Sequence, residues 1–110
     1  MEMNDYQAMA HKTAIYPDNG QVQSLYYTGL GLAGEAGELA GKLSKHFRGD
    51  TALNAVVKGD LVKEMGDVLW YLSEMATVLG VPLEMVAQGN LVKLGNRMSM
   101  GTIKGDGDGR

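Results

Sequence analysis

The sequence contains no cysteine among its 110 residues. Neither a disulfide framework nor a thiolate metal site is available, so a reducing cytoplasm is the expected compartment. The first residues lack the basic start and apolar run of a signal peptide, and nowhere do eighteen apolar residues follow one another. We therefore expect a cytoplasmic protein that has no membrane partner.

Basic residues are outnumbered, because ten lysines and arginines stand against thirteen aspartates and glutamates and the formal net charge is -3. A nucleic-acid groove needs a net basic face, so we expect no nucleic-acid partner. Long runs of β-branched residues with period two are also missing. Apolar residues instead recur at spacings of three and four, which favours an all-α fold.

A chain of 110 residues can bury one modest core but not two. We expect one domain over residues 1–98 and a glycine-rich, mobile tail over residues 99–110, which contain GTIKGDGDGR. Whether this tail lies over the functional site is left open. A helical core this thin would be marginal in an isolated chain, so we expect a bundle completed by dimerisation or tetramerisation.

The bundle should contain about four to five helices. Asn4 or Asp5 would cap the first helix, Asp60 would cap the third, and Gly80 would end the third. The stretch Pro17–Gly20 would break the first helix. Residues 51–58 stay unassigned, and the predicted helices span residues 5–15, 24–46, 61–79 and 82–98.

Glycines are frequent in the second predicted helix. Each costs about 1 kcal/mol relative to alanine in a helix interior, so propensity alone would not choose a helix here. Close packing against a neighbouring helix would offset that cost. The glycines concerned are Gly29, Gly31, Gly34, Gly37 and Gly41.

Two pairs of acidic residues stand within apolar stretches. Glu35 and Glu38 lie three residues apart in LAGEAGELAGKL, and Glu64 and Asp67 repeat that spacing in KEMGDVLWYL. On an α-helix this spacing puts both acids of a pair on one face, about 4.5 Å apart along the axis. If the two helices pack antiparallel, four carboxylates face one another and require a cation to offset their repulsion.

Carboxylate oxygens are hard ligands that suit Mg²⁺ or Mn²⁺. A di-iron site in a helical bundle would need Glu-x-x-His motifs. The residues three before His11 and His46 are Ala8 and Leu43, so this alternative is excluded. A single acid pair is most often a solvated helix face, but two pairs on successive helices favour a metal site.

Glu35-x-x-Glu38 followed by Glu64-x-x-Asp67, in the settings GEAGEL and EMGDVLWYL, resembles the MazG-like all-α nucleoside triphosphate pyrophosphohydrolases. The resemblance covers residues 6–97. It implies a homodimeric or homotetrameric hydrolase that uses Mg²⁺, or Mn²⁺ as a substitute, to cleave a nucleoside triphosphate between its α and β phosphates. It further implies that these four acids are the metal ligands and that Glu35 or Glu38 orients the attacking water.

A triphosphate carries more negative charge than bound cations cancel, so basic side chains should converge on the site. Lys42 serves this role or else pairs with Glu38 along the helix. Trp70 is predicted to lie off the acidic face, in the core or a subunit interface. Charge and the resemblance together give the candidate substrate-binding residues Lys42, Lys63, Tyr71, Asn90, Lys93 and Arg97, of which Tyr71 would contact the base.

Two alternatives stay open. The first is a non-enzymatic helical interaction module with a weak metal site, which Mg²⁺-dependent melting would test. The second is a related all-α pyrophosphatase that acts on dUTP, dCTP or phosphoribosyl-ATP through the same acids and a different base pocket. The preferred base and sugar are therefore not predicted.

Overall fold

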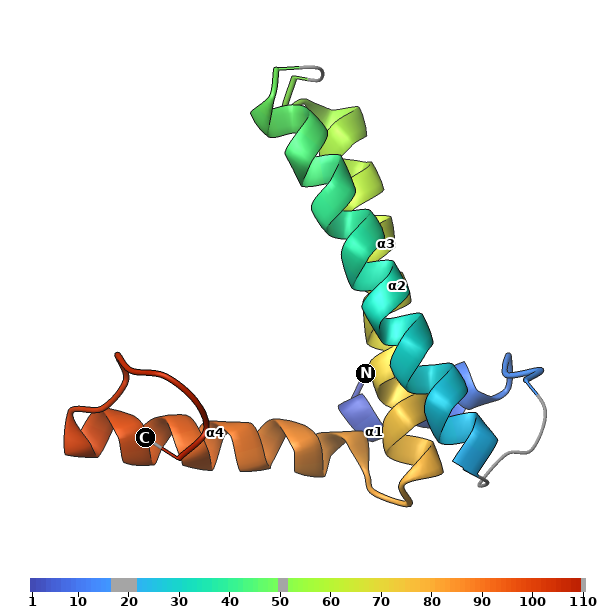
Figure 1. Ribbon diagram of the computed structural model, residues 1–110. Helices are drawn as coiled ribbons and strands as arrows, with labels where there is room; N and C mark the ends of the chain where they lie inside the picture. Colours follow the sequence, from blue (N-terminus) through green and yellow to red (C-terminus); the bar gives the residue numbers. More distant parts are fainter. Residues whose placement is uncertain (17–21, 50–51, 110) are drawn as a thin grey trace.

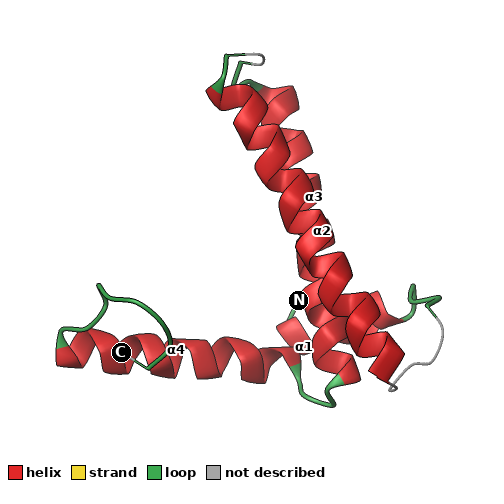
Figure 2. Ribbon diagram, in the orientation of Figure 1, coloured by secondary structure: helices red, strands yellow, loops and turns green. Residues whose placement is uncertain are grey.

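The computed structural model describes residues 1–16, 22–49 and 52–109, and every regular element in these ranges is a helix (Figure 2). The predicted all-α class is confirmed. Pro17–Gly20, predicted to break the first helix, lies outside the described residues. The helices are α1 (Met3–His11), α2 (Val22–Phe47), α3 (Ala55–Val78) and α4 (Leu83–Met100).

The molecule is L-shaped and extends over 43 × 42 × 28 Å. The long helices α2 and α3 lie side by side as an antiparallel hairpin, α1 crosses the foot of this hairpin, and α4 projects away from it (Figure 1). Within the described part of the chain, α4 contacts α1 and α3 but not α2. The hairpin and the projecting arm are therefore joined only at the foot.

Helix α2 is continuous despite its glycines, and only one of them has a packing role within the chain. A Cβ on Gly31 would overlap the ring of Tyr71 on α3, so this position allows close approach of the two helices. The same Cβ would meet nothing within 4 Å at Gly29, Gly34, Gly37 or Gly41. Within this chain, the expectation that close packing offsets the cost of the glycines is confirmed at Gly31.

Three predicted helix ends are wrong. Helix α1 is capped by Glu2, whose N–H donates to the Asp5 carboxylate over 3.1 Å, and it ends at His11 instead of Ile15. Helix α3 begins at Ala55, whereas a cap at Asp60 would have started it at Leu61. Its cap is Asn54, whose side chain accepts the Val57 N–H over 3.0 Å. Asp60 is therefore an interior residue of α3.

The turn between α3 and α4 is as predicted at Gly80, which has a φ of 74° directly after α3. The chain bends by 101° at this turn. In the described residues no single helix is long and apolar enough to cross a membrane, and α3 with α4 passes that test only as a bent pair.

Side chains of α1 fix the direction of α4. The first two N–H groups of α4, on Leu83 and Glu84, donate to the side chains of Gln7 over 2.8 Å and Asn4 over 3.0 Å. Gln7 also donates to the Thr77 hydroxyl and to the Val81 carbonyl. Because free N–H groups at a helix start need partners, α1 acts as the cap of α4.

The core lies at the foot, where α1 meets the hairpin, and it is thin. The buried apolar side chains of the described residues are Ala10, Tyr16, Ala76 and Leu83. Glu74 is fully buried beside them and is bound by the His11 ring at 3.0 Å. Many large apolar side chains along α2, α3 and α4 are exposed, so this chain leaves much apolar surface uncovered.

Candidate metal centre

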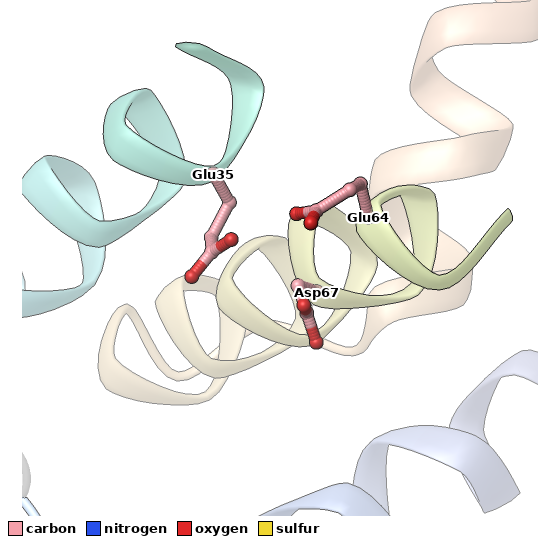
Figure 3. A group of neighbouring side chains, drawn as sticks. All are labelled: Glu35, Glu64 and Asp67. Atoms are coloured by element: carbon pink, nitrogen blue, oxygen red, sulfur yellow. The ribbon is translucent and has the colours of Figure 1, made fainter. Parts of the chain in front are cut away.

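Three of the four predicted acids converge midway along the hairpin. Glu35 projects from α2, and Glu64 and Asp67 project from α3 toward it (Figure 3). Each offers a carboxylate oxygen, and these oxygens lie within 4.8 Å of one another. The antiparallel pairing of α2 and α3 and the three-residue spacing on α3 together produce this group.

Glu38 is exposed and lies outside this group of three. Its charge still reaches the site: partial burial, followed by the charges of Glu38, Asp67 and Glu64, raises the pKa of Glu35 above its ordinary value. The part of this shift that comes from the neighbouring charges reflects repulsion between the carboxylates. A divalent cation among them would relieve that repulsion.

Glu64 is the most buried acid of the group, with 9% of its surface exposed. One of its oxygens receives the Lys42 ammonium over 2.9 Å, and this hydrogen bond raises the pKa of Lys42. Of the two roles left open for Lys42, the pair with Glu38 along the helix is not the one found, because Lys42 pairs with Glu64 across the two helices. The other oxygen, Oε2, is buried without a hydrogen-bond partner, which is costly unless a cation or ligand supplies one.

The donor set fits a hard divalent ion. All of the converging atoms are carboxylate oxygens, which Mg²⁺ and Mn²⁺ prefer. Glu64 contributes an unpartnered oxygen, and Asp67 is exposed enough to accept an ion that retains water ligands. Glu35, Glu64 and Asp67 would hold the ion, with Glu38 one turn further along α2.

A cavity of about 310 Å³ adjoins the acids and is lined by Glu35, Asp67, Trp70 and Tyr71. Tyr71 lies one turn beyond Asp67, as predicted. A hydrogen bond with Tyr27 and burial raise the pKa of Tyr71 to about 12. The Tyr71 hydroxyl therefore stays protonated at neutral pH, and the ring lies against α2.

Trp70 also lines this cavity, so the prediction that it lies off the acidic face is wrong. Residues three apart share a helix face, and Trp70 follows Asp67 by three. The same spacing rule that found the acids could have found Trp70. Gly31 was also missed as a site residue, although its position four before Glu35 puts it on the face of α2 that meets Tyr71.

The predicted phosphate-binding residues on α4 do not reach the acids of their own chain. Asn90, Lys93 and Arg97 lie on the projecting arm, which makes no contact with α2 among the described residues (Figure 1). Lys63, on α3, is exposed. The structure thus brings Lys42 and Tyr71 to the acidic group and places the α4 candidates elsewhere.

The C-terminal tail occupies the cations of α4. Residues 101–109 double back along the arm, and the Asp108 carboxylate accepts Lys93 over 2.9 Å and Arg97 over 3.0 Å (Figure 1). Arg97 donates further to the carbonyls of Gly107 and Asp108. The tail therefore lies on α4 and not over the acidic group, and its Asp108 carboxylate pairs with both Lys93 and Arg97.

Residues 23–100 match the family described as the MazG nucleotide pyrophosphohydrolase domain. The chain therefore belongs to the MazG nucleotide pyrophosphohydrolase family, and the predicted resemblance is confirmed. The chain is also similar to the Gene 37 protein of Mycobacterium phage L5, with 43% identity over 114 residues that cover 100% of both chains. No solved structure matches the chain.

Proposed function

We propose that this protein hydrolyses a nucleoside or deoxynucleoside triphosphate to the monophosphate and pyrophosphate in a Mg²⁺-dependent reaction. The observation that carries the proposal is the convergence of Glu35, Glu64 and Asp67, with the Glu64 Oε2 buried and unpartnered. Membership of the MazG family supports the same reaction. The proposed role is control of the nucleotide pool.

The residues of the chain divide the work between binding and proton handling. Glu35, Glu38, Glu64 and Asp67 would hold Mg²⁺, and Mn²⁺ would substitute for it. Bound Mg²⁺ would neutralise charge on the phosphate oxygens and on the pyrophosphate leaving group. Glu35 or Glu38 would orient the attacking water and accept its proton.

We further propose that a second copy of the chain completes the site. An apolar groove of about 620 Å³ on the hairpin is lined by residues that include Leu39, Val62, Met65, Leu69 and Leu72. Among the described residues no other helix lies along the outer part of α4, which exposes apolar side chains. Packing the arm of one copy on the groove of another would bury both surfaces.

This assembly would also add cations to Lys42, which the acids of the same chain already hold. Lys93 and Arg97 of the second copy would approach the acidic group, with Asn90 beside them, and would replace Asp108 by substrate phosphate. Lys42 and Lys63 would contribute from the same chain as the acids. Charge complementarity between an acidic hairpin and a basic arm favours this occupant of the groove.

The proposed reaction is tested by measuring pyrophosphate release from each common ribonucleoside and deoxynucleoside triphosphate, with Mg²⁺ and with a chelator. We expect pyrophosphate and monophosphate in equal amounts, and only with Mg²⁺. Asp67→Asn, at an exposed position, should keep the fold and lose the activity. Release of orthophosphate, or turnover in the chelator, would contradict the proposal.

The same panel separates the two alternatives. A preference for dUTP, dCTP or phosphoribosyl-ATP would assign the related specificity while leaving the role of the acids unchanged. A rise of the melting temperature in Mg²⁺ without any turnover would favour the interaction module. For the two-chain site, mixing an Asp67→Asn variant with an Arg97→Met variant should restore part of the activity that each lacks.

A further inference from the structure

Trp70 forms one wall of the cavity beside the acids, and residues outside the cavity fix the orientation of its ring. The Trp70 indole N–H donates to the Thr13 hydroxyl over 2.9 Å, and Thr13 in turn donates to the Ala10 carbonyl over 2.7 Å. The indole ring also meets Tyr16 edge to face, with centroids 6.3 Å apart at 88°. The segment after α1 therefore holds the Trp70 ring at the cavity.

Because its N–H is already bonded, Trp70 offers the cavity no hydrogen-bond donor. What the Trp70 side chain can offer a ligand in the cavity is therefore contact with its ring carbons. Tyr71 is similarly committed: its ring lies against Gly31, and Tyr27 holds its hydroxyl. Trp70 and Tyr71 meet edge to face, with centroids 5.0 Å apart at 85°, so the two rings form a rigid corner.

The size and place of this corner suit one planar ring system. A cavity of about 310 Å³ is at the lower end of the range for small-molecule pockets, about 300–1,000 Å³. It begins at Glu35 and Asp67 and extends one helical turn along α3 to Trp70. A ligand anchored by phosphate at the acids would thus place its other end against the indole.

We propose that Trp70 is the side chain on which the nucleobase stacks and that Thr13 is its positioning residue. The inference rests on the proposed function and names the recognition chemistry of the same site. A stacking wall without donors binds any base through its π-face, so this wall contributes affinity shared by all bases and discriminates them by ring size. Selection by hydrogen bonds must come from other groups.

The protein contains a single tryptophan, so its fluorescence reports on Trp70 alone. The wild-type protein is titrated in Mg²⁺ with α,β-methylene nucleoside triphosphates, which bind without being cleaved at that bond, and with inorganic tripolyphosphate. We expect the emission to be quenched by the nucleoside analogues and unchanged by tripolyphosphate. Calorimetry on the same samples confirms that both have bound. An unchanged emission in the presence of bound analogue overturns the proposal.

Variants give a second, independent measurement. Trp70→Leu should raise the Kd of the analogues about tenfold and leave the Kd of tripolyphosphate unchanged, because base stacking is lost and phosphate binding is kept. Trp70→Phe should change the Kd of the analogues less than threefold. Thr13→Val keeps the shape of the side chain but removes the hydroxyl that accepts the Trp70 N–H. It should therefore weaken analogue binding although Trp70 itself is unchanged. The matched control is Tyr26→Leu, an exposed aromatic on α2.

The possible results separate this inference from the proposed function. Normal pyrophosphate release with unaltered analogue binding in Trp70→Leu overturns the stacking role and leaves the reaction standing. If the wild-type protein shows neither turnover nor nucleotide binding, the stacking role and the proposed function are both overturned. If the emission follows protein dilution and ignores nucleotide, Trp70 belongs to a subunit contact and the inference is wrong.

Discussion

The substitution Gly31→Ala tests how closely α2 and α3 are packed beside the site. The added Cβ would lie 2.6 Å from the Tyr71 Cζ and closer still to other ring carbons. Overpacking of this kind costs about 1–3 kcal/mol, whereas glycine to alanine in a helix interior gains about 1 kcal/mol. The matched control is Gly37→Ala, where nothing lies within 4 Å and only the gain applies.

Because both variants make the same change within α2, the helix-propensity gain cancels between them. The difference in unfolding free energy should therefore equal the overpacking cost, about 1–3 kcal/mol, with Gly31→Ala the less stable. Urea unfolding at one fixed protein concentration measures it, since any association also adds to stability. Equal stability of the two variants would show that Tyr71 does not pack on α2 as described.

The tyrosine titration of Gly31→Ala provides a second readout. In the folded protein a hydrogen bond with Tyr27 and burial raise the pKa of Tyr71 from 10.0 to about 12. A raised pKa gives stability that is present below pH 10 and is lost as the pH rises through about 12. Displacing the ring should lower this pKa toward 10, so absorbance at alkaline pH should show earlier ionisation than in Gly37→Ala.

Three further predictions follow from the site. Glu38→Gln should lower kcat by orders of magnitude while the circular dichroism spectrum persists, and a fully active variant would remove Glu38 from the ligand set. Tyr71→Ala should raise KM for all bases alike, because the Tyr71 ring supports Trp70 and its hydroxyl is hydrogen-bonded to Tyr27, and a loss confined to one preferred base would show that Tyr71 itself selects the base. Asp108→Asn should speed tryptic cleavage after Lys104, because the tail loses its contact with Lys93. Release of the tail is also expected in wild-type protein as the pH falls through the Asp108 pKa, which hydrogen bonds from Lys93 and Arg97 hold below its ordinary value; cleavage within the tail by a protease that is active in acid measures it.

The helical class and the acidic group could be predicted because both depend on spacing along continuous helices. Once α2 and α3 are helical and antiparallel, the three-residue interval fixes the face on which Glu64 and Asp67 lie, and Glu35 meets them across the hairpin. The same rule applied to Trp70 would have placed it beside Asp67. The prediction for Trp70 was wrong because it assigned a large aromatic residue to the core by residue type alone.

Features that depend on contacts between distant residues could not be predicted in this way. Thr13 was expected in the first helix, but α1 ends at His11, before Thr13 is reached. The Thr13 hydroxyl instead accepts the indole N–H of Trp70, 57 residues away in the sequence. Asn4 was expected to cap α1 and instead caps α4, 80 residues later in the sequence. Local propensity is overridden wherever a side chain finds a partner elsewhere in the fold.

The direction of α4 has the largest consequence for function. Gln7 and Asn4 hold the first turn of α4 at the foot of the hairpin, and the 101° bend carries Lys93 and Arg97 away from the acids of the same chain. Lys42, which is paired with Glu64, would by itself leave a metal-bound triphosphate with uncancelled charge. The proposed reaction therefore requires a second copy, and its arm must first exchange the Asp108 carboxylate for a phosphate. An active monomer would refute this step even if the acids bind metal as proposed.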